Sequence, residues 1–533
     1  MNSKNCENKL FKPEYIFVFL ILFQIIIGLL SWLAFSKAAN DPDVIYHSLK
    51  SYFLPVEITR GMRKSLADIF DVSISSLNLE YFHISFSQLK LKTSYKVIEE
   101  LSRWFIIIVY GVSWFFIIRL KAFRELSSRK IFFYSAVLFS VAGFCLPNDS
   151  SDVYGYIARG AQQVFFNQNP YQEVVSSVEG WRQNIFFTNM LWENNPAPYG
   201  PLFMLLCRGI VFISFNNFWI SLFLFKFINI ISFFILVKVL MILFKNRNLD
   251  SAAETNASSH FGSKQLLLVL LFNPLFLMEI AWNAHNDILM CLFICISFLY
   301  MQKNKFGLAL LMILIATLLK YLSIVLIPLI FIAAFKHSSN IRKLFSSLFY
   351  AGLISLLITA FSIIHYRLLE VDHSRFQENL TLSHKSLFSL LNAISQGLFR
   401  FSFPSEAKYI FFAVFIVFAA YLYVKFLFIH SDISQESPSV DKYSETLFQE
   451  LLNNTFLLMV GLILFTSPKF HSWYLLGFLP FGFISFPDIS LALSFTHLLS
   501  FTVIDQAKIL NFALMTASVF VLRKFKIFHK SPF

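Results

Sequence analysis

Long apolar runs recur along nearly the whole of this chain, and they constrain its fold more than any motif does. A helix needs about 20 mainly apolar residues to cross the hydrocarbon core of a bilayer, and runs of about that length or somewhat shorter continue almost to the carboxyl terminus. Hydrophobic residues make up 57% of the 533 residues and charged residues only 14%, which leaves too little polar surface for a soluble globule. The sequence therefore predicts an all-α polytopic membrane protein.

The formal net charge of +13 does not indicate nucleic-acid binding. The Lys and Arg residues lie in short loops between apolar runs, where positive charge marks the cytoplasmic side of a membrane protein. The five Cys are an odd number and lie mainly within apolar runs, so they predict neither a disulfide framework nor a metal site. We therefore expect membrane lipid, and no nucleic acid, among the partners.

The distribution of Lys and Arg among the loops also predicts how the chain is oriented in the membrane. The run from about 15 to 35 follows several Lys residues and is expected to be an uncleaved anchor with a cytoplasmic amino end. The loop at 119–130 carries five positive charges and one negative charge, so it is cytoplasmic, and the next span delivers residue 149 to the outer face. Later basic loops fall inside only if residues 201–215 form a re-entrant or interfacial helix. This topology has about 14 transmembrane helices.

Four separate polar segments fall on one membrane face in this topology. They are residues 148–156, 279–287, 320–321 and 467–474. None of them lies in a basic cytoplasmic loop. Because ionisable residues near a membrane core are costly and are usually functional, this convergence is the strongest indication of a functional site that the sequence offers.

The residue types in these segments fit chemistry on an anionic lipid. A carboxylate can deprotonate an acceptor hydroxyl, and cationic side chains can bind a lipid phosphate. Asp152 is the preferred base, because Asp149 can instead cap the following helix, where Ser150 and Ser151 compete for that role. The available cations are Arg159, His285, Lys320, Lys469 and His471.

Several candidates also have a purely structural interpretation. Trp473 and Tyr474 are either anchors at the membrane interface or platforms for a sugar ring. Lys320 either extends from a helix end toward the polar interface or faces a substrate. His285 with Asp287 either caps the start of a helix or belongs to the site. The residues alone leave these alternatives open.

Taken in order, the motifs resemble a known family. They are Ser151-Asp152-Val153-Tyr154-x-Tyr156 with Gly160, Asn169-Pro170-Tyr171, Tyr199-Gly200-Pro201, Asn273-Pro274-Leu275, His285-Asn286-Asp287, Lys320-Tyr321 and Pro468-Lys469-Phe470-His471-x-Trp473-Tyr474. This series resembles the bacterial polyprenol-phosphate-mannose-dependent mannosyltransferases of the GT-C class of membrane glycosyltransferases. The resemblance covers about 147 to 480. Arg159 departs from it, since some relatives carry an acidic residue before the glycine.

The resemblance implies a GT-C-like fold whose first large external loop carries the catalytic carboxylate. Such enzymes transfer a hexose, here mannose, from a polyprenyl-phosphate donor to a hydroxyl of a lipid or glycan acceptor, with inversion at the anomeric carbon. Asp152 would be the general base. Asp149 would assist it or bind a divalent cation, the one cofactor that remains an alternative. The enzyme would be a multi-pass protein of the inner (plasma) membrane with an extracytoplasmic active site.

The resemblance also implies roles for the other candidates. Cationic groups would stabilise the departing lipid phosphate, and amides, carboxylates and aromatic rings would position sugar or acceptor. The expected substrate-binding residues are Tyr156, Arg159, Asn169, Tyr171, Tyr199, His285, Asn286, Asp287, Lys320, Tyr321, Lys469, His471, Trp473 and Tyr474.

The expected organisation has six parts. They are an N-terminal anchor helix (1–35), an extracytoplasmic insert (36–102), a transmembrane pair (103–147), an external catalytic loop with interfacial helices (148–200), a transmembrane GT-C core (201–487), and C-terminal spans with a basic tail (488–533).

Two other classes of function fit some of these observations. Polar groups between spans also mark substrate paths in transporters and flippases of lipid-linked sugars. The apolar runs show no inverted repeat, however, and the polar residues gather at one face. A catalytically inactive assembly subunit is the third alternative, and it predicts that the carboxylates tolerate substitution.

Overall fold

A computed structural model describes residues 12–38, 105–106, 108–147, 150–190, 192–251, 262–338, 340–370, 387–388, 391–392, 395, 402–428, 440–467 and 471–500. Two of the expected site residues, Asp149 and Lys469, lie outside these ranges. The same is true of the 36–102 insert beyond its first three residues, and of the basic tail.

The described part of the chain contains helices and no strand, as the composition predicts. Its elements are α1 (Glu14–Ala38), the helix Ile108–Arg119, α5 (Lys121–Glu125), α6 (Ser128–Phe144), α7 (Asp152–Phe165), η2 (Val175–Ser177), η3 (Trp181–Gln183), α8 (Ile185–Thr188), α9 (Pro201–Ile213), α10 (Phe218–Ser251), α11 (Ser263–Leu271), α12 (Pro274–Phe276), η4 (Leu277–Trp282), α13 (Asp287–Gln302), α14 (Phe306–Leu319), η5 (Tyr321–Leu326), α15 (Ile327–His337), α16 (Ile341–Tyr366), η6 (Leu368–Glu370), η7 (Ser405–Ala407), α19 (Lys408–Phe428), α20 (Val440–Thr466), η9 (Ser472–Gly477), α21 (Leu479–Ser485) and α22 (Pro487–Ser500).

Within the described residues, five helices are long and apolar enough to cross a membrane. Six qualify if α11 and the α12–η4 segment, which are bent by 42° at their break, count as one span. Five further apolar helices are shorter than a full span, among them α9, α13 and α14. The helical membrane architecture is therefore confirmed, whereas the number of about 14 crossings stays a prediction.

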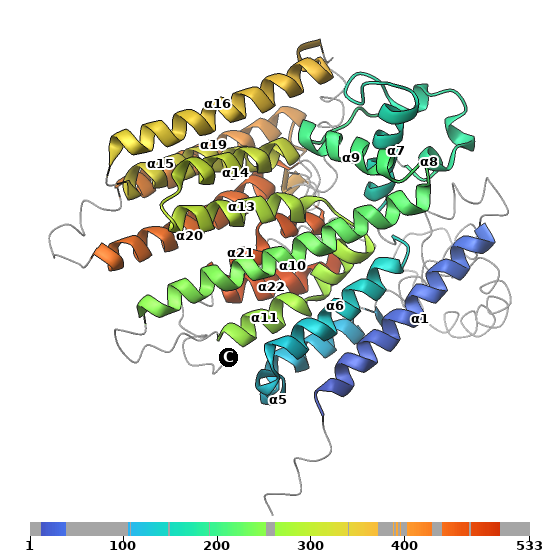
Figure 1. Ribbon diagram of the computed structural model, residues 1–533, viewed down its shortest axis with the longest axis horizontal. Coiled ribbons are helices and arrows are strands. Elements are labelled where there is room, and N and C mark those ends of the chain that lie inside the picture. The colour runs from blue at the N-terminus through green and yellow to red at the C-terminus, as the bar shows by residue number, and fades with distance from the viewer. Residues whose placement is uncertain are drawn as a thin grey trace, which may run out of the picture.

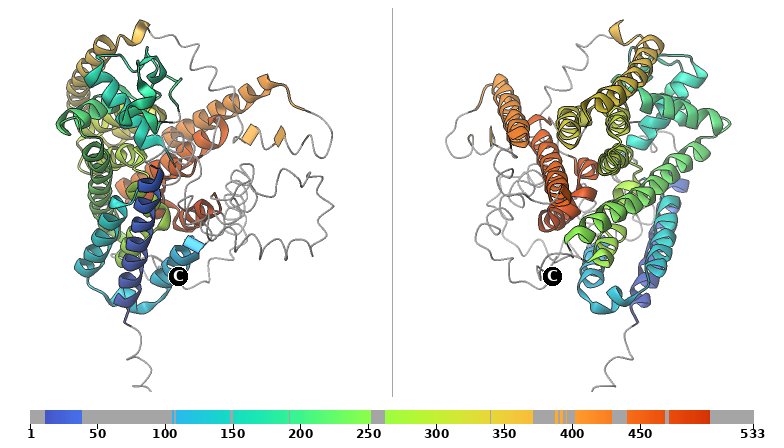
Figure 2. Two further views of the ribbon diagram at one scale, coloured as in Figure 1. Left: turned by 90° about the vertical axis from the view of Figure 1, so that its right-hand side faces the viewer. Right: turned by 60° about the vertical axis from the view of Figure 1, so that its left-hand side comes forward.

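Within the described ranges, two clusters of buried apolar side chains hold the elements together. The larger cluster runs through α6, α10, α11, α13, α14, α20 and α21. The smaller one lies among α7, α8, α9 and the start of α10. α1 packs on α6 and α19 packs on α20, on separate sides of the bundle (Figure 2). We call residues 150–190 with 192–213 the cap, because they fold beside the ends of α10 and α16 (Figure 1).

The cap contains the helix that the charge distribution sets apart. α9 has 13 residues, so it rises about 20 Å, less than the roughly 30 Å of a hydrocarbon core. It packs along α7 and reverses direction at Phe215 and Asn216, both with positive φ, before α10 begins. These features fit the re-entrant or interfacial helix expected for 201–215.

Two glycines allow the cap to approach its neighbours closely. A Cβ atom on Gly160 of α7 would lie 2.4 Å from the backbone oxygen of Cys207 in α9. A Cβ atom on Gly200 would lie 2.0 Å from the backbone oxygen of Leu318 in α14. Only glycine leaves room for such contacts. The Gly200 contact brings the cap against the end of α14, immediately before Lys320.

Candidate active site

Asp152 is the first residue of α7 and lies where the cap meets the bundle. The backbone N–H of Asp152 donates a hydrogen bond of 3.2 Å to Ser150 Oγ. One face of α7 packs on α9, so the helix start is fixed, and its dipole favours a negative charge there. The carboxylate side chain of Asp152 keeps 15% of its surface exposed, which leaves it accessible to a substrate.

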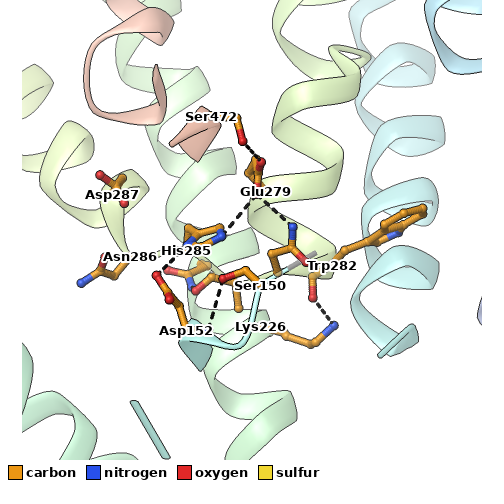
Figure 3. A network of polar contacts seen from close by, with 12 residues as sticks. Ser150, Asp152, Lys226, Glu279, Trp282, His285, Asn286, Asp287 and Ser472 are labelled. Atoms are coloured by element: carbon orange, nitrogen blue, oxygen red, sulfur yellow. Dashed lines mark hydrogen bonds and ion pairs between the residues drawn. The ribbon is translucent and has the colours of Figure 1, made fainter. Parts of the chain in front are cut away.

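His285 lies between two carboxylates (Figure 3). Its Nδ1 atom is 3.4 Å from Asp152 Oδ2, and its Nε2 atom is 3.3 Å from Glu279 Oε2. Glu279 Oε2 also accepts a hydrogen bond of 2.9 Å from Asn283, and Oε1 accepts one of 2.7 Å from Ser472. The side chains of His285 and Glu279 are fully buried. Asp152, His285 and Glu279 therefore form a continuous row that leads from the accessible carboxylate into the protein.

The backbone around this row is irregular. Glu279 lies in η4, a π-helical turn, and π-helical turns occur frequently at functional sites. Ala284 has a φ of 57°, a costly conformation for a residue other than glycine. The Nζ atom of Lys226 donates hydrogen bonds to the backbone oxygens of Trp282 at 2.7 Å and Ala281 at 3.2 Å, and it also bonds the backbone oxygen of Cys145. Lys226 thus fixes the end of η4 beside the end of α6.

The charges in the row favour an anionic Asp152. Burial by itself would raise the pKa of Asp152, but His285, with smaller contributions from His471 and Lys320, holds that pKa below its usual value. Burial would lower the pKa of His285, which lies in the loop between η4 and α13, but the carboxylates of Asp152 and Glu279 raise it to about 9. At neutral pH these contacts favour an anionic Asp152 beside an imidazolium at His285.

A second ion pair lies next to this row. Both oxygens of Asp287, at the start of α13, accept from Lys320 Nζ at 2.8 Å. Lys320 is the junction residue between α14 and η5. Its ammonium also lies 5.1 Å from the centre of the Tyr474 ring, which fits a cation–π contact. The Lys320 side chain retains 13% exposure, so an incoming anion can reach it.

Trp473 joins the fourth polar segment to the site. Its ring stacks on His285 at a centroid distance of 4.1 Å and an angle of 10°, and on His471 at 4.1 Å and 17°. The indole therefore lies between two imidazole rings, one of which contacts Asp152. The structure thus places Trp473 and Tyr474 against other candidates, and their role toward a sugar stays a prediction.

Tyr156 and Tyr199 of the cap lie near Asp152, and Tyr171 and Asn169 extend this set toward α16. The hydroxyl of Tyr156 donates to Asn286 Oδ1 at 3.4 Å, and its ring meets that of Tyr199 edge to face at 5.2 Å. The hydroxyl of Tyr171 donates to the backbone oxygen of Tyr199 at 2.7 Å. The amide of Asn169 donates to the Tyr366 backbone oxygen at 2.5 Å and thereby ties the cap to α16.

Two candidates lie farther from the row. Arg159 is buried within the cap, where its guanidinium donates to Gln162 Oε1 at 3.0 Å and to the backbone oxygens of Glu173 and Asn195. Tyr321 is 45% exposed beside Tyr171. These contacts hold the cap together, and a substrate-binding role for either residue stays a prediction.

The structure therefore brings together residues from all four polar segments, with Asp149 and Lys469 outside its description. Sequence reasoning did not single out Glu279 or Lys226 as functional, and it missed the contact of Ser472 with Glu279. The sequence did contain a signal for Glu279 and Lys226, because each is an ionisable residue inside an apolar run. Such residues are rare in membrane proteins and usually have a function. Among the described residues, no group of three or more His, Cys, Asp or Glu side chains is suited to a metal ion. A divalent cation stays an expectation tied to Asp149.

Comparison with known families now gives the class of the protein. Residues 81–336 match the family model for the N-terminal domain of alpha-(1->6)-mannopyranosyltransferase. The chain is a membrane glycosyltransferase. The match confirms the resemblance to mannosyltransferases of the GT-C type over just under half of the sequence. No curated protein and no solved structure matches the chain.

The matched domain of this glycosyltransferase contains most of the described site. Asp152, Glu279, His285 and Lys320 lie within residues 81–336, whereas η9 with Trp473 lies beyond them. The stacking of Trp473 on His285 links the two parts. The candidate site therefore combines the mannosyltransferase domain with a later segment of the same chain.

Proposed function

We propose that this enzyme transfers a mannosyl group from a polyprenyl-phosphate donor to an acceptor hydroxyl, with inversion at the anomeric carbon and with Asp152 as general base. The observation that carries the proposal is the contact of the accessible Asp152 carboxylate with His285, 3.4 Å away, which favours the anionic form. An anionic carboxylate at a partly exposed position can accept a proton from a bound hydroxyl.

The charges around Asp152 fit both halves of the reaction. The acceptor oxygen attacks the anomeric carbon while its proton passes to Asp152, and the bond from that carbon to the phosphate oxygen breaks. The leaving polyprenyl phosphate gains negative charge. Lys320, with a protonated His471, would supply positive charge to it, and such electrostatic stabilisation is large where water is excluded. Tyr474 offers an aromatic ring to the sugar, whereas the faces of the Trp473 ring are covered by His285 and His471.

The name of the matched family indicates which glycosidic linkage the enzyme forms. The name alpha-(1->6)-mannopyranosyltransferase denotes transfer of a mannopyranosyl group through an α-linkage to a C6 hydroxyl. An inverting transfer from a β-linked donor gives this α-linkage in one step. We therefore propose a glycan or glycolipid with a free C6 hydroxyl as the acceptor class, and a mannoside as its simplest probe.

The direct test is Asp152→Asn, which keeps the shape of the side chain and removes its basicity. We expect a loss of kcat of about 1,000-fold or more, within the range for removal of a general base together with its charge. The assay is transfer from polyprenyl-phosphate [3H]mannose to octyl α-mannoside in detergent. Asp488→Asn, in the first turn of α22 and outside the site, is the matched control. Full transfer activity in a folded Asp152→Asn protein would remove Asp152 from this role.

The proposed location is the extracytoplasmic face of the inner (plasma) membrane. The basic loops support it, because they lie at the opposite ends of the spans from the polar segments. Single cysteines on a background without native Cys test it at two exposed positions, Ser177 in the cap and Lys303 after α13. An impermeant maleimide should label S177C, and not K303C, in intact cells. The reverse pattern contradicts the proposed orientation.

A further inference from the structure

His285 is not arranged like a residue that binds a phosphate. Both of its ring nitrogens face carboxylates, at 3.4 Å from Asp152 and 3.3 Å from Glu279, and the side chain is fully buried. One face of the ring is covered as well, since Trp473 stacks on the imidazole. An incoming anion can approach Lys320 but not the nitrogens of His285. The imidazolium therefore acts on Asp152 and not on the donor.

Glu279 is the feature of this row that the transfer mechanism leaves unused. It is a fully buried carboxylate within an otherwise apolar turn, and it lies on the side of His285 away from Asp152. Ser472 and Asn283 donate hydrogen bonds to its two oxygens and fix the plane of the carboxylate. A buried charge of this kind is expensive unless its partners compensate it. Its position indicates a role that packing alone does not explain.

We propose that Glu279 is a positioning residue. It acts through His285 to keep the catalytic carboxylate of Asp152 ionised and correctly oriented in the site. This inference rests on the proposed function, because it assumes that Asp152 is the base. Glu279 itself contacts neither substrate nor the reacting atoms.

The physical basis is the alternation of charge along the row. A carboxylate on one ring nitrogen of a histidine fixes the orientation of the ring and the proton on the other nitrogen. Glu279 also lowers the free energy of the imidazolium, which burial would otherwise disfavour. The imidazolium in turn keeps Asp152 ionised and aimed into the site. Loss of Glu279 leaves His285 with a single carboxylate partner and a freer ring.

Other titratable groups face this row, but each of them has a different partner or is neutral, so none of them duplicates the contact of Glu279 with His285. Lys320 is paired with Asp287. His471 is separated from His285 by the Trp473 ring. The remaining groups among the residues that the structure describes are the phenols of Tyr156, Tyr199 and Tyr474, whose ordinary pKa of about 10 keeps them neutral at physiological pH.

The first test is Glu279→Gln, which keeps the size of the side chain and its ability to accept from Ser472. We expect kcat to fall about 10- to 100-fold, a fraction of the effect of a general base, with KM for the octyl α-mannoside acceptor unchanged. The alkaline limb of the pH profile should move to lower pH, because His285 loses one of the two carboxylates that favour its proton. A purely structural role would not move that limb. Glu193→Gln, elsewhere in the cap, is the matched control.

The second test is a double-mutant cycle, which remains informative if one variant is less stable. If Glu279 acts only through His285, Glu279→Gln should cost almost nothing in a His285→Gln background. Additive losses in the cycle, a KM effect without a kcat effect, or a wild-type pH profile in Glu279→Gln would each overturn the inference.

The outcomes separate this inference from the proposed function. An inactive Asp152→Asn protein together with a wild-type Glu279→Gln protein removes only the role of Glu279. A fully active Asp152→Asn protein removes the proposed base itself, whatever Glu279→Gln does.

Discussion

Lys226 and Lys320 both carry an ammonium group into the protein, but they meet different partners. Lys226 is fully buried in α10 and donates only to backbone oxygens at the ends of α6 and η4. Lys320 keeps 13% exposure, and its partner is the carboxylate of Asp287. A cation enclosed by backbone carbonyls has a structural role, because it cannot reach a ligand and holds the helix ends that carry those carbonyls. A cation paired with a carboxylate at an accessible edge can rearrange toward an anionic substrate.

The largest expected effect tests the structural half of this comparison. Lys226→Met should lower the free energy of unfolding by about 3 kcal/mol or more, because three buried carbonyls lose their donor and each unsatisfied group costs about 1–3 kcal/mol. The measurement is the midpoint of thermal unfolding in detergent. Lys238→Met, at an exposed position in the same helix, is the matched control and should unfold like wild type. Equal midpoints for the two variants would remove the structural role of Lys226.

The next effect tests the catalytic half. Lys320→Met should lower kcat about 100-fold, because the leaving phosphate loses a preorganised positive charge. It also leaves Asp287 uncompensated, so the double variant Lys320→Met with Asp287→Asn should recover the unfolding midpoint without recovering activity. Lys305→Met, at an exposed position before α14, is the control. Recovery of kcat in the double variant would show that the pair is structural, as the Lys226 contacts are.

The smallest effect is a pH dependence that Lys226 should not influence. The pKa of His285 is raised to about 9, so the imidazolium is present below that pH and is lost as pH rises through it. Transfer should therefore decline above pH 9 by up to about tenfold per unit. The same group stabilises the fold fully below its unfolded pKa of about 6.5 and loses this contribution through pH 9. His285→Gln should abolish the alkaline limb, and an unchanged limb would assign it to another group.

The all-helical architecture and much of the candidate site could be predicted from the sequence, because both depend on local patterns. Apolar runs predict membrane helices, and polar residues at their ends predict groups that gather at one face. The contacts of His285 could not be predicted in this way. They depend on a π-helical turn at Glu279 and a positive φ at Ala284, which shift the loop relative to a regular helix. Neither feature has a clear pattern in the residues.

The role of Lys226 was hidden for a related reason. Within a long apolar run, one lysine is compatible with an exposed side chain that extends to the lipid interface. Only the three-dimensional arrangement shows that α6 and η4 both end opposite it. The close approach of Gly200 to α14 is a second such feature, since glycine in a loop usually indicates only a turn.

The stacked Trp473 has a practical consequence for protein engineering. The ring comes from η9, outside residues 81–336, yet it covers His285, the histidine that contacts Asp152. A chimera built from residues 81–336 alone would inherit Asp152, Glu279, His285 and Lys320, but its host would supply whatever aromatic group lies over the imidazole. The surroundings of His285, and with them the pH dependence of transfer, should then follow the recipient chain as well as the donated domain.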